Sequence, residues 1–344
     1  MPRSVPVAGR PKEAQLPARN HSLAVKRVLC ATDFSDAASA ALEVGVIFAR
    51  ACKAEIRVVH VCPARAPASA GMAHRPGVDG GSRRELTGSL DRCAQRAIAC
   101  GLAIRSVLLE GDPPGEIVRA AGEAAADLIV MGRHSRGAPG AWIVGSVTER
   151  VIREAPCPVV VARAFPRPRG ETPRHVLCAL DLGQTAGTTL EYAVAVANAL
   201  EGDLLVLDVA AREGVPDAWK ALAALVAKAP VASRGLREGV VTGVPYQEIL
   251  AAARESGSDL VVVGSHGGGF ADRPFLGATT VHLLRQSECP VLVVPAGVSR
   301  RRQQASRQGP PSALDVTETP DVATRLRSCD GRSERRRPSG WWGR

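Results

Sequence analysis

Short, almost continuously apolar runs alternate along the chain with longer segments that are predicted to be helical. In the first half, the apolar runs cover residues 26–31, 55–61, 103–109, 127–131 and 157–162. The intervening helices are predicted at 36–52, 83–100, 114–125 and 146–155. Continuous apolar runs are typical of strands in a parallel sheet whose two faces are both covered. The alternation therefore predicts a doubly wound α/β sheet with right-handed crossovers.

Residue types at two helix boundaries support these limits. Ser35 and Asp36 stand where the first helix begins, and such side chains cap the free N–H groups of a first turn. Gly101 follows the second helix, where a glycine commonly forms the C-cap.

The whole pattern occurs twice. Residues 127–163 and 259–295 match at a constant offset of 132 positions, and the first strand and helix match at an offset of 148. The difference is an Ala-, Gly- and Pro-rich insertion at 64–81 of the first copy, which reads as a surface loop. A period this long indicates two copies of a domain rather than a solenoid. The equivalent pairs are Asp33 and Asp181, Val61 and Val209, Gly132 and Gly264, and Gly145 and Gly277.

Length and composition agree with two soluble domains. The chain has 344 residues, of which 45% are hydrophobic and only 3% aromatic, so an aliphatic core is expected. No apolar run is long enough for a spanning helix, and the basic N-terminus lacks the apolar stretch of a signal peptide. These features favour a cytoplasmic protein with no membrane contact.

The net charge of +10 is concentrated at the two ends of the chain. Residues 1–27 hold six Lys or Arg and one Glu, residues 298–344 hold eleven Arg and five acids, and residues 28–297 are close to neutral. The ends are too polar to form a core, so we expect disordered tails at 1–24 and 298–344. This distribution does not favour specific nucleic-acid binding.

Nine cysteines occur without any CxxC or other metal-ligand spacing. Those on apolar strands, such as Cys30 and Cys178, are expected to be small core residues in a reducing compartment. No metal site is predicted from them.

Candidate chemistry gathers at the carboxyl ends of two strands in each copy. Asp33 ends the first strand, and Gly132 opens a loop after the fourth strand that closes at Gly145 and Ser146, at the start of a helix. Glycines let a backbone approach a phosphate closely, and helix N–H groups supply positive charge. The aspartate is a candidate acceptor for ribose hydroxyls, with helix capping as the alternative. The P-loop and dinucleotide motifs are both absent.

These residues resemble the universal stress protein family. The aspartate and a loop of the form G-x2-G-x9-G-[ST] appear in both copies, over about residues 25–165 and 173–296. The resemblance implies a tandem protein of two five-stranded parallel-sheet domains, order 3-2-1-4-5, of adenine-nucleotide α-hydrolase-like fold. It further implies ATP or AMP as ligand, with Mg²⁺ as a candidate bridge between phosphates. The implied binding residues are Asp33, Val61, Gly132, Ser135, Gly145, Ser146, Val147, Asp181, Val209, Gly264, Gly267, Gly277, Ala278 and Thr279.

Each copy departs from the family motif at one place. Ser135 stands for the second glycine in the first copy, and Ala278 stands for the hydroxyl residue in the second, where Thr279 follows. One neutral hydrogen bond contributes only about 0.5–1.5 kcal/mol, so weakening rather than loss of binding is expected. Val61 and Val209 are implied neighbours of the adenine, with ordinary strand core as the alternative. Arg133, Arg136 and Arg273 are candidate phosphate contacts, with a solvated loop as the alternative.

Three functions remain open from the sequence. The first is a regulatory, stress-response protein that binds adenine nucleotide with little or no turnover and acts through an unidentified protein partner. The second is an interaction scaffold that binds no nucleotide, and the third is a weak ATP-hydrolysing enzyme. The residues disfavour the third, because no loop lysine, catalytic triad or paired metal carboxylates are evident.

The fifth strand of each copy is expected to be an apolar edge, and such edges pair readily. Universal stress domains typically meet through this strand, so we expect 157–163 to pair with 289–295 within one chain; a homodimer is a further option. The predicted domains are 25–165 and 173–297, joined by a Pro-rich linker at 166–172.

Overall fold

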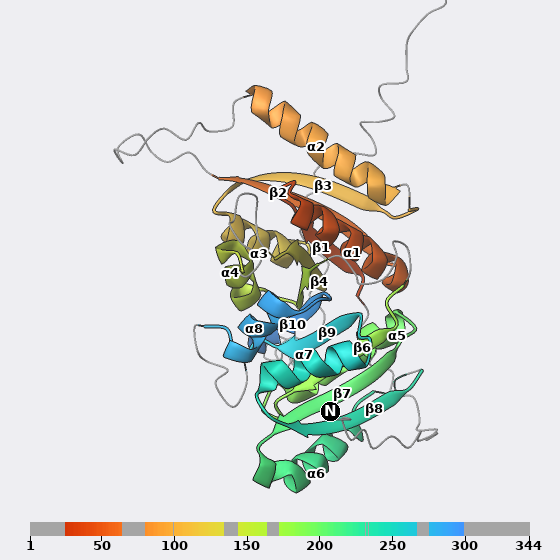
Figure 1. Ribbon diagram of the computed structural model, residues 1–344. Coiled ribbons are helices and arrows are strands. Elements are labelled where there is room, and N and C mark those ends of the chain that lie inside the picture. The colour runs from red at the N-terminus through yellow and green to blue at the C-terminus, as the bar shows by residue number, and fades with distance from the viewer. Residues whose placement is uncertain are drawn as a thin grey trace, which may run out of the picture. The chain divides into compact units, whose positions relative to one another are not determined.

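The computed structural model describes residues 25–63, 80–98, 100–133, 144–163, 172–230, 232, 234–266 and 275–298. Strands and helices alternate in both copies as predicted (Figure 1). The first repeat contains β1 Arg27–Ala31, α1 Asp36–Cys52, β2 Glu55–Pro63, α2 Gly80–Ile98, β3 Ile104–Gly111, α3 Pro113–Glu123, β4 Leu128–Gly132, α4 Ser146–Glu154 and β5 Val159–Ala162. The second contains β6 His175–Leu180, α5 Ala186–Ala199, β7 Asp203–Ala210, the 3₁₀ turn η1 Arg212–Gly214, α6 Val215–Val226, β8 Leu236–Thr242, α7 Pro245–Glu255, β9 Leu260–Gly264, α8 Ala278–Gln286 and β10 Val291–Val294.

Each repeat forms five parallel strands in the predicted order. The strands run β3-β2-β1-β4-β5 in the first repeat and β8-β7-β6-β9-β10 in the second. In this order the first and fourth strands of each repeat are neighbours, with crossovers leaving in opposite directions. The doubly wound fold with order 3-2-1-4-5 is therefore confirmed, and it creates a ligand crevice at the carboxyl ends of these two strands.

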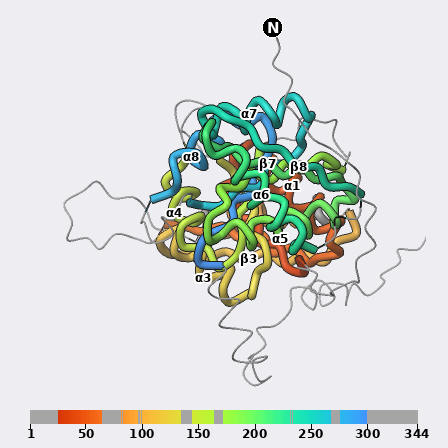
Figure 2. Tube along the Cα trace, turned by 90° about the horizontal axis from the view of Figure 1, so that it is seen from below, coloured from red at the N-terminus to blue at the C-terminus, as the bar shows by residue number. Residues whose placement is uncertain are grey.

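Helices cover both faces of the sheet. One buried cluster packs the sheet against α1, α2, α5 and α6, and the other packs it against α3, α4, α7 and α8. Figure 2 shows α4 and α8 on one side, with α1 and α5 on the other. The clusters consist mostly of Val, Leu, Ile and Ala, as the low aromatic content predicts.

The two predicted capping residues, Ser35 and Gly101, have the geometry expected of helix caps. The Ser35 side chain accepts a hydrogen bond from Ala38 N–H, and Gly101 adopts a positive φ of 75° after α2. In α2 the helix already begins at Gly80, so the last two residues of the predicted insertion loop are helical. Residues 64–79 lie outside the described part of the chain.

Buried cysteines act as small core residues. A Cβ added to Gly45 of α1 would lie 2.3 Å from Cys30 Sγ of β1, so only glycine lets this helix pack against the strand. Burial raises the pKa of Cys30 to about 12, which keeps its thiol protonated and unreactive. The described residues contain no group of three or more His, Cys, Asp or Glu that could hold a metal ion.

An aspartate that occurs in both repeats binds the backbone at the start of the first strand of its own repeat. Asp127 accepts hydrogen bonds from the N–H groups of Lys26 and Arg27, at 2.8 and 2.9 Å. Asp259 accepts equivalent bonds from Arg174 and His175, at 2.8 and 3.0 Å. The aspartate therefore has a structural role in both copies. It accepts hydrogen bonds from backbone N–H groups at the N-terminal ends of the strands, away from the crevice at their carboxyl ends.

The two repeats are joined edge to edge. Strand β10 pairs antiparallel with β5, in a register that sets Leu292 opposite Val160, and the result is one ten-stranded sheet. Both residues are fully buried. The predicted pairing of 157–163 with 289–295 is confirmed, and linker residues 164–171 lie outside the described part.

The C-terminal limit of the folded part lies beyond the predicted one. Val298, the first residue assigned to the C-terminal tail, is only 3% exposed and packs in the α1/α5 cluster. The tails at 1–24 and 299–344 lie outside the described residues, so their disorder stays a prediction.

The first repeat alone, residues 25–163, is expected to dimerise because its β5 edge has lost β10. Light scattering after size exclusion should give twice the monomer mass at tens of micromolar. The full-length chain, whose β5 edge is already paired, is the control and should keep one mass over the same range. A strictly monomeric first repeat would show that this edge does not drive association.

Candidate functional site

A cavity of about 470 Å³ lies at the carboxyl ends of β6 and β9 in the second repeat. Most of the residues predicted for this copy meet there, from four separate parts of the chain. Those that line the cavity are Asp181, Val209, Gly264, Gly277, Ala278 and Thr279. Gly267, the other residue predicted for this copy, lies outside the described residues.

Asp181 follows directly after β6 and is exposed at the crevice. Leu182 adopts a left-handed φ of 51°, and the turn brings Gly183 N–H to 3.1 Å from Asp181 Oδ1. Helix α5 starts only at Ala186, after Thr185, and the N-cap makes no side-chain hydrogen bond. The N-cap residue of this helix is therefore Thr185 and not Asp181.

The opposite wall is the N-terminus of α8. Gly277 is the N-cap, and its N–H donates to Ser265 O at 2.9 Å, which closes the loop. The Thr280 hydroxyl donates to Gly264 O at 2.9 Å and ties the first turn of α8 to the end of β9. The first N–H groups of a helix have no acceptor within it, so α8 presents partial positive charge to the cavity.

The rest of the wall is largely apolar. Leu180, Val209, Ile249 and Val263 line it, and Phe275 lies at the cavity with 68% of its surface exposed. None of the described residues that line it is Lys or Arg. An apolar cavity whose lining includes a carboxylate and helix N–H groups suits a flat ring joined to an anionic group.

A buried carboxylate that the sequence reasoning missed lies beside this cavity. Asp208 of β7 is only 5% exposed, and burial, followed by the nearby charge of Asp181, raises its pKa. The first repeat has His60 at the equivalent position, and its Nδ1 lies 2.7 Å from Thr32 O. In the sequence, the only indication of this buried carboxylate is that Asp208 replaces a His within an apolar strand.

In the first repeat, Asp33 is engaged by the cap of α1. Its Oδ1 accepts from Ser35 N–H at 3.0 Å and from the Ser35 hydroxyl at 2.5 Å, while Ser35 caps Ala38. Gly183 replaces Ser35 in the second repeat. Both aspartates therefore accept a hydrogen bond from the N–H group two residues further on, and Asp33 accepts a second one from the Ser35 hydroxyl.

The start of α4 in the first repeat has the same backbone arrangement as the start of α8 in the second. Gly145 N–H donates to Arg133 O at 2.9 Å, and the Thr148 hydroxyl donates to Gly132 O at 3.0 Å, as in the second repeat. Ser146 is exposed at the start of α4, Val147 is half-buried, and Val61 is 8% exposed on β2. Ser135 lies outside the described residues.

Two loop residues take places that the sequence did not predict. Arg133 is 5% exposed and donates from Nη1 to Arg285 O of α8, at 2.6 Å. Arg133 is therefore not part of a solvated loop, so this alternative was wrong for Arg133, whereas Arg136 and Arg273 lie outside the described residues. His266 lines the second-repeat cavity, with Nδ1 2.8 Å from Ser265 Oγ.

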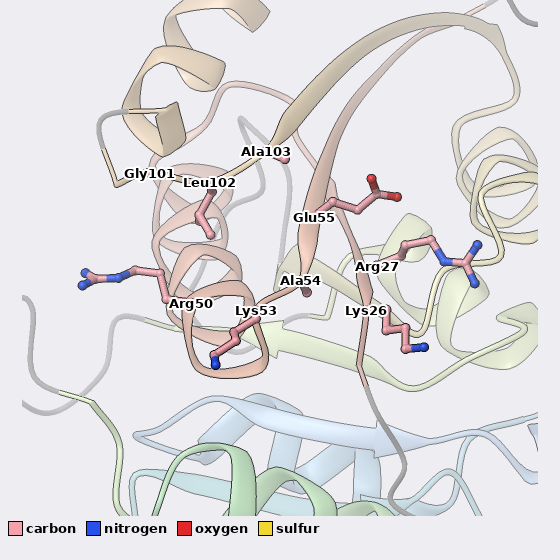
Figure 3. A pocket seen from close by; sticks show the side chains of 9 residues that line it. All are labelled: Lys26, Arg27, Arg50, Lys53, Ala54, Glu55, Gly101, Leu102 and Ala103. Carbon is pink, nitrogen blue, oxygen red and sulfur yellow. The ribbon is translucent and has the colours of Figure 1, made fainter.

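A second groove, of about 690 Å³, lies at the opposite end of the first-repeat strands (Figure 3). Lys26, Arg27, Arg50 and Lys53 line it together with Glu55. Lys53 is the C-cap of α1 and Arg50 lies in its last turn, where cations complement the helix dipole. The groove lies away from the crevice at the carboxyl ends of the strands, so it is not the predicted nucleotide site.

Comparison with known proteins agrees with this architecture. The profile of the Universal stress protein family matches residues 24–163 and 172–295. A universal stress protein of Thermus aquaticus is 35% identical over 147 residues, which is 40% of this chain and 98% of that protein. One from Mycobacterium tuberculosis (strain ATCC 25618 / H37Rv) is 26% identical over 227 residues, 61% of this chain and 76% of that protein. The crystal structure of a universal stress protein from Archaeoglobus fulgidus superposes with a TM-score of 0.62 at 25% identity, covering 80% of this chain and all of that one.

The chain thus belongs to the universal stress protein family, as two domains of that family in tandem. No helix in the described part of the chain is long and apolar enough to cross a membrane.

The equivalent glycines Gly132 and Gly264 are expected to respond differently to alanine. A Cβ at Gly132 would lie 2.9 Å from the Ala37 carbonyl carbon of α1, whereas one at Gly264 meets no atom closer than 3.3 Å. Gly132→Ala should therefore destabilise the protein by about 1–3 kcal/mol, and Gly264→Ala by less. Thermal unfolding of both variants measures this difference. Equal melting temperatures would show that α1 shifts to accommodate the added methyl group without loss of stability.

Proposed function

We propose that this chain is a regulatory nucleotide-binding protein whose second repeat holds ATP or AMP. The observation that carries the proposal is the cavity where Asp181, Gly264 and the N-terminus of α8 converge at the strand-order reversal. Ligands of open α/β sheets bind at this point, and helix N-termini bind phosphates.

Each wall of the cavity has a role in this proposal. The adenine packs on the apolar side beside Val209, and the Asp181 carboxylate accepts from the ribose hydroxyls. The phosphates approach Gly264 and Gly277 and accept from the N–H groups of Ala278 and Thr279, where Thr279 also offers a hydroxyl. Ala278 lacks that hydroxyl but keeps its N–H.

The composition of the lining supports binding with little or no turnover. Phosphoryl transfer depends on cationic groups and metal ions that stabilise charge in the transition state. The described lining residues supply neither Lys nor Arg, and only one carboxylate, Asp181. Mg²⁺ would be held mainly by the nucleotide itself and would neutralise phosphate charge, because the single carboxylate of the lining, Asp181, is assigned to the ribose.

An interaction scaffold that binds no nucleotide is the second candidate function. The contacts of the first repeat are consistent with such a role for that repeat. There Asp33 is occupied with the α1 cap, so this repeat contributes mainly the β5 edge that pairs with the second. We therefore place the ligand in the second repeat. A cytoplasmic location and an unidentified protein partner that responds to the bound state complete the proposal.

The two aspartates give a matched pair of variants. Asp181→Ala should weaken ATP binding about tenfold or more, because the ribose loses a charged acceptor. Asp33→Ala should leave ATP affinity unchanged and lower stability by about 1 kcal/mol, because it loosens the α1 cap. Isothermal titration calorimetry and thermal unfolding measure the two effects.

Absence of ATP or AMP binding by the unaltered protein would refute the proposed function and favour the scaffold. Binding that is lost in Asp33→Ala and kept in Asp181→Ala would move the site to the first repeat. Rapid release of phosphate from ATP would contradict the low turnover.

A further inference from the structure

Two arginines of the first repeat reach across the junction to one helix of the second. Arg133 Nη1 donates to Arg285 O at 2.6 Å, and Arg163 Nη1 donates to Ser287 O at 2.7 Å. Arg133 immediately follows β4, and Arg163 immediately follows β5, the strand that pairs with β10. Both acceptors belong to the C-terminal end of α8.

These contacts satisfy a specific need of that helix. The last carbonyl groups of a helix have no intrahelical donor, and the helix end carries partial negative charge. A guanidinium group supplies both a donor and a positive charge, so the two arginines hold this end of α8 by charge-assisted hydrogen bonds. Ser287, the C-cap, is itself 2% exposed, so the contacts are largely shielded from water.

The burial of Arg133 is energetically unfavourable, so packing alone does not explain it. Its side chain is buried, its Nε has no hydrogen-bond partner among the described residues, and burial together with the charge of Arg163 lowers its pKa. Burying a cation with incomplete pairing is unfavourable. Packing alone would be served better by an apolar side chain of the same size.

These contacts run from the first repeat to the second and have no equivalent in the reverse direction at the same positions. Ser265 and Pro295 occupy the equivalent positions in the second repeat. The Ser265 hydroxyl is bonded within its own repeat, to Ala296 N–H at 3.1 Å and His266 Nδ1 at 2.8 Å, and Pro295 has no N–H. The first repeat therefore holds α8, whereas the equivalent positions of the second repeat cannot hold α4 in the same way.

The opposite end of α8 is a wall of the nucleotide cavity. Ala278, Thr279 and Thr280 line it, and α8 has only nine residues. A short helix moves as a unit, so its C-terminal anchor also determines where its first N–H groups point. Leu283 and Leu284 are buried between the two ends and keep the helix on the sheet.

We infer that Arg133 and Arg163 are positioning residues for the nucleotide site of the second repeat. They touch no ligand, and they act by fixing α8 so that its N-terminal N–H groups meet the phosphates. The second-repeat site is therefore completed by the first repeat, which gives the tandem arrangement a function beyond covering an edge. This inference rests on the proposed function of the cavity.

The test uses the full-length chain with ATP as the probe. Arg133→Met keeps the buried volume and removes the charge and donors; ATP affinity is expected to fall about three- to tenfold. Arg133→Lys keeps a charged donor and should recover part of this loss. Arg153→Met is the matched control, because the exposed Arg153 holds the α4 position equivalent to Arg285 and, among the described residues, its ion pair is with Glu154, at 3.7 Å.

A second readout separates positioning from general stability. Amide hydrogen exchange of the peptide covering 278–286, measured without nucleotide, should be faster in Arg133→Met than in the unaltered chain or in Arg153→Met. If Arg133→Met does not fold, Arg163→Met serves instead, because Arg163 is only half-buried.

Unchanged ATP affinity in the folded arginine variants would overturn the inference while leaving the proposed function intact. A fall in melting temperature with unchanged affinity would also overturn it, because the arginines would then only stabilise the junction. Lack of ATP binding by the unaltered chain would overturn the proposed function and the inference together.

Discussion

The antiparallel pairing of β5 with β10 is the contact on which the rest of the structure depends. Each strand alone would leave four apolar residues and a row of unpaired backbone groups at the edge of a sheet. Pairing satisfies both edges and buries Val160 and Leu292 completely. It also brings the residue after β5, Arg163, to the end of α8, a helix whose other end lines the cavity of the second repeat.

The two repeats show how one backbone supports different roles through few substitutions. Ser35 in the first repeat engages Asp33 and caps α1, whereas Gly183 in the second leaves Asp181 at the mouth of a cavity. Arg133 in the first repeat reaches its neighbour, whereas Ser265 bonds within its own repeat. The two repeats thus differ in these contacts, with no change in strand order.

Hydrophobic patterning was sufficient to predict the strands and helices, because short, continuous apolar runs between helical segments are typical of a parallel sheet covered on both faces. The repeat was evident from residues that match at constant offsets along the chain. The strand order and the edge pairing came from the family resemblance, since neither follows from periodicity. The second hydrogen bond of Asp33 depends on a residue two positions away, and the contact of Arg133 depends on a carbonyl 152 positions away. Backbone acceptors leave no mark on side-chain patterns, so contacts of this kind cannot be found from one sequence.

The most direct test of the account is a crystal structure of the full chain with a non-hydrolysable ATP analogue. The account predicts one nucleotide, in the second repeat, with its ribose at Asp181 and its phosphates at the N–H groups of Ala278, Thr279 and Thr280. Arg133 and Arg163 should still contact the carbonyl groups of Arg285 and Ser287 in that complex. Nucleotide bound only beside Asp33, or only in the basic groove around Lys53, would contradict it.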